Sequence, residues 1–187
     1  SIADSVAFAI KTPIGTVVQT GDFKIDVTPL QGEMTDLTRF GELGREGVLA
    51  LLMDSTNVER PGHSLSESKV HDRFDQLFKD CDKRIIVTTF ASNVDRIRQI
   101  IDLAVKYKRK VGITGRSMEN VVKLCVELGY MKVPDGILVD MKRIGSVPRN
   151  KLVILSTGSQ GESMSALYRM AFSEHKQVDI GSGDRVI

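Results

Sequence analysis

Two β-rich runs at the beginning of the chain are separated by a short turn. Residues 6–12 and 16–20 are rich in apolar and β-branched side chains, and Pro13-Ile14-Gly15 lies between them. Turn residues between two such runs are typical of a β-hairpin. A polar segment follows, and residues 48–53 then form a short continuous apolar run. Such a run is typical of a fully buried parallel strand, so we expect a hairpin followed by a buried strand.

After residue 57 the pattern becomes a repeated succession of helix, strand and polar loop. The first helix is predicted from Ser64-Leu65-Ser66-Glu67, which has the spacing of a capping box, to about Asp80. Strands are predicted at residues 84–90, 110–114, 137–139 and 152–155, and helices at 94–104, 118–128 and 164–171, with a last strand beginning near residue 183. This alternation predicts an α/β fold with a mostly parallel sheet flanked by helices on both faces, as in Rossmann-like domains.

The chain is expected to divide into two parts. The polar stretch at residues 58–63, which contains Pro61-Gly62, is the strongest candidate for a junction. Residues 1–63 and 64–187 are therefore predicted to belong to different domains. The chain lacks an initiator Met and ends at the start of an apparent strand, which suggests an internal piece of a longer protein.

Composition narrows the function classes only a little. The chain has 187 residues and a formal net charge of +2, so any nucleic-acid contact must come from a local patch. Cys81 and Cys125 lack the spacing of metal ligands and are interpreted as reduced thiols. Neither a membrane span nor a signal peptide is evident. We expect a soluble, cytoplasmic protein without a membrane partner.

Four polar loops follow predicted strands, at residues 54–57, 91–93, 115–117 and 156–162. Ligands of parallel α/β sheets bind at the carboxyl ends of the strands. Three of the loops are predicted to lead straight into helix N-termini, which favour anions, so a phosphate is the expected ligand. Arg116 could bind it in a bidentate manner. Ordinary helix capping explains each loop singly, and no Walker or GxGxxG motif is present.

Asp22 and Asp54 are the carboxylates most suggestive of chemistry, because each follows a β-rich or apolar run and is expected at a strand end. Either could be a plain turn or capping residue, and Asp22 could instead bridge divalent ions. The three histidines, His63, His71 and His175, are scattered and are interpreted as surface or structural residues. Neither a metal cluster nor a catalytic triad can be argued from the sequence.

Several motifs at these positions resemble those of the ribonuclease J family of metallo-β-lactamase/β-CASP enzymes. They are Thr20-Gly21-Asp22-Phe23-Lys24, Met53-Asp54-Ser55-Thr56-Asn57, Phe90-Ala91-Ser92-Asn93, Gly115-Arg116-Ser117-Met118 and Thr157-Gly158-Ser159-Gln160-Gly161-Glu162. Ser1-Ile2-Ala3-Asp4-Ser5 resembles the segment after the family's third metal-binding motif, whose His would lie immediately before Ser1. Asp95 and Ser163 depart from the family, which more often carries His and Pro there.

The resemblance implies that residues 1–63 are part of a metallo-β-lactamase β-sandwich and that residues 64–187 are part of a β-CASP domain. It implies a zinc-dependent ribonuclease of RNA processing and decay, with 5′-to-3′ exonuclease and endonuclease activity and two zinc ions per full-length subunit. Asp22 would bridge the zinc ions, and Asp54 would orient a His beyond the end of this chain. The family's other metal-binding motifs have no counterpart here, so the chain alone is expected to bind zinc weakly and to be inactive.

The same resemblance implies a partner and its binding residues. The partner is single-stranded RNA with a 5′ monophosphate. The RNA-binding or phosphate-binding residues would be Ser92, Asn93, Arg116, Ser117 and Ser159. The full-length protein is expected to form a homo-oligomer or to pair with a paralogue. Two alternatives remain open: a non-catalytic phosphate- or nucleotide-binding module, and a paralogue that serves as the partner subunit of a nuclease complex.

Overall fold

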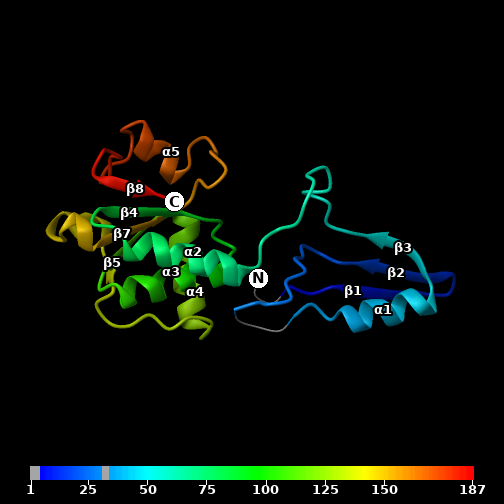
Figure 1. Cartoon of the computed structure of the whole chain (residues 1–187). Helices are drawn as coiled ribbons and strands as arrows, with labels where there is room; N and C mark the ends of the chain where they lie inside the picture. The colour runs from blue at the N-terminus through cyan, green and yellow to red at the C-terminus, as the bar shows by residue number, and fades with distance from the viewer. Residues whose placement is uncertain (1–4, 31–33) are drawn as a thin grey trace. The chain divides into compact units, whose positions relative to one another are not determined.

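The computed structural model describes residues 5–30 and 34–187, and the chain forms two compact units, Ser1–Val70 and His71–Ile187 (Figure 1). Helix α2 (Glu67–Lys79) begins in the first unit and ends in the second. The assignment of residues 1–63 and 64–187 to two domains stays a prediction, and the segment Ser1 to Asp4 lies outside the described residues. No helix in the described part of the chain is long and apolar enough to cross a bilayer.

The first unit contains a three-stranded sheet. β1 (Phe8–Thr12) and β2 (Gly15–Gln19) pair antiparallel, which confirms the predicted hairpin, and β3 (Val48–Leu52) pairs parallel with β2. The expectation that this third strand is fully buried is wrong, because all five of its residues are exposed in this unit. Among the described strands, β3 pairs with β2 alone, and a continuous apolar run does not by itself bury both faces of an edge strand.

The position of β3 also corrects the grouping of the four polar loops. β3 belongs to the three-stranded sheet, whereas the strands before the other three loops belong to a separate five-stranded sheet. The loop at residues 54–57 therefore does not share a sheet edge with the other three.

Helix α1 (Leu37–Glu46) was not predicted, because its residues were taken as part of a polar connecting segment. The Asp36 side chain caps it by accepting a 2.9 Å hydrogen bond from the backbone N–H of Arg39. Leu43 is buried and lies six positions after Leu37 and three after Phe40. This helical spacing and the cap were signals that could have revealed the helix.

Helix α2 begins at Glu67, three residues later than the capping-box pattern predicted. Two side chains cap this start: Ser66 Oγ accepts the Ser68 backbone N–H at 3.2 Å, and the Asp26 carboxylate accepts the Glu67 backbone N–H at 2.8 Å. This hydrogen bond is the main reason that the pKa of Asp26 lies below its ordinary value. The buried Glu67 side chain in turn pairs with Lys24 Nζ at 3.0 Å.

The second unit is the predicted α/β fold. Its sheet is entirely parallel, with the order β6-β5-β7-β4-β8. The strands are β4 (Arg84–Thr88), β5 (Lys110–Thr114), β6 (Leu138–Val139), β7 (Leu152–Ser156) and β8 (Asp184–Val186). The helices are α3 (Val94–Lys106), α4 (Arg116–Glu127), α5 (Ala166–Ala171) and two short 3₁₀ helices, η1 (Met141–Ser146) and η2 (Arg149–Lys151).

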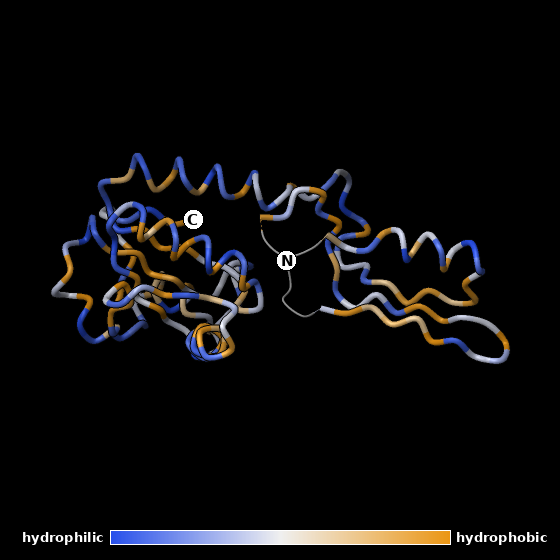
Figure 2. The backbone as a smooth tube through the Cα atoms, turned by 90° about the horizontal axis from the view of Figure 1, so that it is seen from below, coloured by the Kyte–Doolittle hydropathy of each residue, from blue (hydrophilic) through white to orange (hydrophobic). Residues whose placement is uncertain are grey.

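The central strands are buried on both faces, as their continuous apolar sequences predict. Ile86 and Ile154 form one row across β4 and β7 and pack with Met170 of α5 and Ile144 of η1. α2, α3 and α4 lie on the other side of the sheet from α5 (Figure 1), and the strands of this sheet are rich in hydrophobic residues (Figure 2). The two free cysteines, Cys81 and Cys125, are also buried here. A rigid parallel sheet thus supports the loops at its carboxyl edge.

Candidate functional site

The loops after β2 and β3 bring Asp22 and Asp54 to one edge of the three-stranded sheet. The two strands run parallel, so their carboxyl ends lie side by side. Thr20 connects them, because its backbone N–H donates to Leu52 O at 3.0 Å and its Oγ1 accepts the Asp54 backbone N–H at 3.3 Å. No local pattern in the sequence indicates a role for this threonine, because the role depends on a pairing between strands that are distant in sequence.

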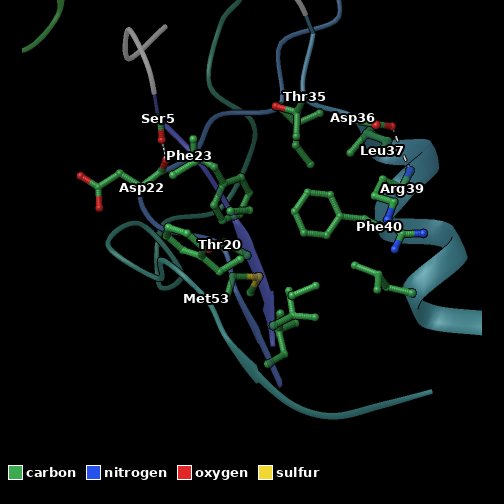
Figure 3. A pocket seen from close by; sticks show the side chains of 18 of the residues that line it. Ser5, Thr20, Asp22, Phe23, Thr35, Asp36, Leu37, Arg39, Phe40 and Met53 are labelled. Atoms are coloured by element: carbon green, nitrogen blue, oxygen red, sulfur yellow. Dashed lines mark hydrogen bonds between the residues drawn. The ribbon is translucent and has the colours of Figure 1, made fainter. Parts of the chain in front are cut away.

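Asp22 presents its carboxylate away from the body of the first unit. Its backbone oxygen accepts a 2.9 Å hydrogen bond from Ser5 Oγ, whereas its side chain is exposed. The carboxylate points away from the neighbouring cavity, into which the Phe23 and Phe40 rings project (Figure 3). Within residues 5–30 and 34–187, no group donates a hydrogen bond to this carboxylate. It can therefore accept an external ligand without breaking a hydrogen bond to the described residues.

Asp54 has a different environment. Its Oδ1 accepts hydrogen bonds from the Thr56 backbone N–H at 2.9 Å and from Thr56 Oγ1 at 2.6 Å. These two hydrogen bonds, the side-chain one first, and the backbone amide of Phe23 hold the pKa of Asp54 below its ordinary value. The carboxylate is therefore ionised at neutral pH and forms the local turn that was one of the two readings of this residue.

The cavity beside this edge has a volume of about 740 Å³ and lies between α1 and the sheet (Figure 3). Its lining is largely apolar and includes Phe8, Val18, Leu43 and Met53. Its lining also includes two carboxylates, Asp22 and Asp36, which are fewer than the about four ligands of a tetrahedral zinc site.

The fit of a metal ion to these residues is partial. Among the residues that the structure describes, no group of three or more His, Cys, Asp and Glu side chains could hold a metal ion. Asp22 can supply one exposed oxygen ligand, and a tetrahedral zinc site needs about four. At least two ligands of any tetrahedral zinc site that includes Asp22 must therefore come from outside the described residues.

The other five predicted site residues lie at the carboxyl edge of the five-stranded sheet. The loops after β4, β5 and β7 carry them, and these strands are adjacent in the order β5-β7-β4. The backbone N–H of Thr89 donates to Ser156 O at 3.2 Å, which fixes the first residues beyond β4 to the end of β7. Neighbouring strands lie about 4.8 Å apart, so the three loops begin side by side.

Ser92 and Asn93 precede helix α3. Ser92 is exposed, and Asn93 is the N-cap of the helix, with its Oδ1 accepting the Arg96 backbone N–H at 3.1 Å. The ordinary helix capping that was the alternative to ligand binding is therefore present in this loop. A ligand at this position could still bind the amide nitrogen of Asn93 and the hydroxyl of Ser92.

Arg116 and Ser117 are the first residues of helix α4, and both are exposed. Gly115 is the N-cap, and it has no side chain that could accept a hydrogen bond from the first turn. The φ angle of Gly115 is +106°, and an added Cβ would lie 2.9 Å from Thr157 Oγ1. The glycine therefore permits close packing against the neighbouring loop and supplies no capping side chain to a turn that begins with an exposed arginine, an arrangement suited to an anion.

Ser159 is exposed in the loop after β7, but this loop does not lead straight into a helix, contrary to expectation. Helix α5 begins only at Ala166 and is capped by Ser165, whose Oγ accepts the Tyr168 backbone N–H. Met164, which was predicted to be helical, has a φ angle of +68°, a conformation outside the right-handed helix. Ser159 can therefore contribute its hydroxyl but not a helix N-terminus.

Two further residues at this edge escaped the sequence analysis. His175 was interpreted as a surface or structural residue, yet its Nε2 lies 2.8 Å from Thr114 Oγ1 at the end of β5. The two residues are 61 positions apart, and no local signal in the sequence connects them.

Comparison with known proteins decides the family. The family description "Ribonuclease J, beta-CASP domain" matches residues 82–187, which include the whole five-stranded sheet. The chain belongs to the ribonuclease J family. The β-CASP match contains the loops after β4, β5 and β7, and therefore all five predicted RNA-binding residues of this family member.

Full-length relatives extend the similarity over the whole chain. Ribonuclease J of Synechocystis sp. is 48% identical and ribonuclease J of Helicobacter pylori 46% identical over all 187 residues. Ribonuclease J2 of Bacillus subtilis is 40% identical over the same length. The chain spans 29%, 27% and 34% of these three relatives.

A solved structure supports the fold alone. A crystal structure of a protein of unknown function from Enterococcus faecalis matches with a TM-score of 0.57 and 16% sequence identity. The match covers 97% of this chain and 50% of the other. The fold of this ribonuclease J family member thus recurs in a protein of very different sequence.

Proposed function

We propose that this chain is the part of a zinc-dependent ribonuclease J that recognises the 5′ end of RNA and supplies one ligand of the metal centre. The observation that carries the proposal is the uncapped first turn of α4, where Arg116 lies at the same sheet edge as the loops after β4 and β7. The family membership of the chain supports RNA as the ligand.

The phosphate of a 5′-monophosphorylated single strand would lie at the N-terminus of α4. The free N–H groups of this turn and the helix dipole favour an anion, and the Arg116 guanidinium can donate two parallel hydrogen bonds to phosphate oxygens. Ser117, Ser92, Asn93 and Ser159 would bind the phosphate or the nucleotides that follow it. Recognition of the terminus would direct degradation from the 5′ to the 3′ end, alongside endonucleolytic cleavage.

Asp22 would bridge two zinc ions, with the remaining ligands supplied by parts of the full-length subunit that this chain does not contain. When bound, the ions would polarise the scissile phosphate and lower the pKa of a bound water. Asp54, held ionised by Thr56, would orient a histidine from elsewhere in the protein. With one ligand of its own, the 187-residue chain would bind zinc weakly and would not cleave RNA.

Hydrolysis of RNA by a full-length polypeptide that contains this chain tests the proposal. The substrates are one RNA with a 5′ monophosphate and the same RNA with a 5′ triphosphate, each with zinc or manganese and with a chelator. We expect chelator-sensitive degradation that favours the monophosphate and that Asp22→Ala abolishes. Asp72→Ala, at an exposed position on α2, is the matched control and should leave the activity unchanged. Degradation that survives both the chelator and Asp22→Ala would contradict the role of zinc.

A non-catalytic phosphate-binding module is the second candidate. The uncapped first turn of α4 fits it equally well, and the described residues supply no complete metal site. A partner subunit of a nuclease complex would have the same features. Binding of the monophosphorylated RNA without degradation by the full-length polypeptide would favour these two functions. We also propose that the full-length protein forms a homo-oligomer or a complex with a paralogue, and that it acts in the cytoplasm.

A further inference from the structure

The His175 ring is hydrogen-bonded through both of its nitrogens. Nδ1 accepts the backbone N–H groups of Gln177 at 3.3 Å and Val178 at 3.2 Å. An Nδ1 that accepts carries no proton, so the neutral ring has its proton on Nε2. That nitrogen lies 2.8 Å from Thr114 Oγ1 and donates to it.

This hydrogen bond connects the segment after α5 to the strand that leads into Arg116. Thr114 is buried and is the last residue of β5, directly before Gly115. The backbone N–H of His175 donates to Arg169 O of α5 at 3.0 Å, and the backbone N–H of Leu167, near the start of α5, donates to Thr157 O at 3.1 Å. α5 is thereby attached to β7 at its start and, through His175, to β5 beyond its end.

Thr157, which follows β7, packs closely against Gly115, which follows β5. Because an added Cβ on Gly115 would lie 2.9 Å from Thr157 Oγ1, the end of β5 has little room to shift toward β7. The position of the first turn of α4 therefore depends on two supports, the Thr157 side chain and the His175 ring.

We propose that His175 is a positioning residue for the phosphate-binding turn at Arg116 and Ser117, and that protonation of its ring loosens this turn and weakens the binding of a 5′-phosphorylated RNA. The inference rests on the proposed function, because it specifies how the same RNA-binding edge is regulated. A proton on Nδ1 would face two backbone N–H groups, so the protonated ring cannot keep its present contacts.

The surroundings of the ring favour its neutral form. Burial and the positive charge of Arg169 on α5 lower the pKa of His175 from its ordinary value of 6.5, and the carboxylate of Asp179 partly opposes them. Thr114, the contact from β5, does not titrate. The neutral ring is thus the form that the fold stabilises at neutral pH, and acidification below the ordinary histidine range protonates it.

The test measures the dissociation constant of a fluorescent 5′-monophosphorylated RNA oligonucleotide from this chain at about pH 7.5 and about pH 5.5. His175→Gln is the decisive variant, because its amide can donate to Thr114 and accept a backbone N–H but cannot be protonated in this range. The RNA phosphate itself also titrates between these pH values. Dividing the change of the wild-type dissociation constant by that of His175→Gln removes this contribution. His63→Gln, on an exposed loop of the first unit, is the control for histidine titration in general.

We expect wild type and His63→Gln to lose affinity on acidification about tenfold more than His175→Gln does, the effect of about one hydrogen-bonded contact. Thr114→Val, which removes the acceptor with little change of shape, should weaken binding at both pH values and should also remove the excess pH dependence. Equal pH dependence in wild type and His175→Gln would overturn the proposal.

A second readout separates failure of the inference from failure of the proposed function. The amide nitrogen and proton shifts of Gly115 and Ser117 are followed by NMR across the same pH range without RNA. Their titration in wild type but not in His175→Gln supports the positioning role, and constant shifts overturn it. If the RNA fails to bind at either pH while the shifts titrate, the proposed RNA function is wrong and the coupling of His175 to the turn stands.

Discussion

Arg84 and Asp184 form a two-point ion pair between the first residues of two neighbouring parallel strands, β4 and β8. Arg84 Nε and Nη2 donate to the two carboxylate oxygens, each at 2.7 Å, and the Asp184 side chain is fully buried. Arg84 also donates to Asp179 O, and Asp184 accepts the Gly181 backbone N–H at 2.9 Å. The pair fixes the last strand of the chain to the edge of the sheet.

Replacement of Asp184 by Asn should lower the free energy of unfolding by about 3–5 kcal/mol, because it leaves the Arg84 guanidinium buried without its counter-charge. Arg149→Ala is the matched control, since Arg149 reaches the same carboxylate at 3.4 Å but is 58% exposed. Arg149→Ala should lower the free energy of unfolding by about 0–1 kcal/mol. Urea unfolding followed by circular dichroism measures both, and similar effects of the two variants would contradict the account.

The same pair predicts a loss of stability in acid. Burial acts to raise the pKa of Asp184, but the hydrogen bonds from Arg84 and from the Gly181 amide, with the charges of Arg84 and Arg149, outweigh it and hold that pKa below 3.8. A depressed pKa contributes stability that is present above the unfolded value, near 3.8, and is lost as pH falls through the folded value. Urea midpoints should therefore fall below about pH 4, and less steeply in Asp184→Asn. An identical slope in the two proteins would argue against the assignment.

Gly115→Ala should destabilise the chain by about 1–3 kcal/mol and weaken RNA binding, because the residue combines a left-handed φ with contact to Thr157. Gly129→Ala is the control, since Gly129 has a φ of +78° and no atom within 4 Å of an added Cβ. Gly129→Ala should lower the free energy of unfolding only through backbone strain, and it should leave RNA binding unchanged. Thermal unfolding and RNA titration of both variants test this, and equal RNA affinity in the two would contradict a role for Gly115 in shaping the turn.

Thr56→Val should raise the pKa of Asp54 toward its ordinary value, because it removes the 2.6 Å hydrogen bond that contributes most to the depression. The backbone N–H of residue 56 would still donate, so the rise should be partial. Carbonyl-carbon NMR of Asp54 across acidic pH measures it, with Ser55→Ala as the control for a neighbouring hydroxyl. A pKa unaffected by Thr56→Val would show that the backbone contacts alone stabilise the carboxylate.

The sequence predicted the elements whose pattern is set by neighbours along the chain. The hairpin followed from Pro13-Ile14-Gly15, and the central strands β4 and β7 followed from apolar runs that are buried on both faces. The run at β3 has the same pattern but is an exposed edge strand, because burial depends on what packs against a strand and not on its own composition.

The candidate site was predictable to a similar extent. Asp22, Asp54 and Arg116 were located at strand ends, since strand ends can be predicted from the pattern. The contacts of Thr20 with β3 and of His175 with Thr114 could not be predicted, because each joins segments that only the folded chain brings together. The capping of α2 by Asp26 is of the same kind.

The proposed function requires that the edge formed by the loops after β4, β5 and β7 binds the 5′ phosphate of RNA. The most direct test is the affinity of this chain for one RNA oligonucleotide with a 5′ monophosphate and for the same oligonucleotide with a 5′ hydroxyl, in wild type and Arg116→Ala at fixed salt. We expect wild type to prefer the phosphate by about tenfold or more and Arg116→Ala to lose most of this preference. Equal affinity of wild type for the two RNAs, or a preference that Arg116→Ala retains, would contradict the proposed function.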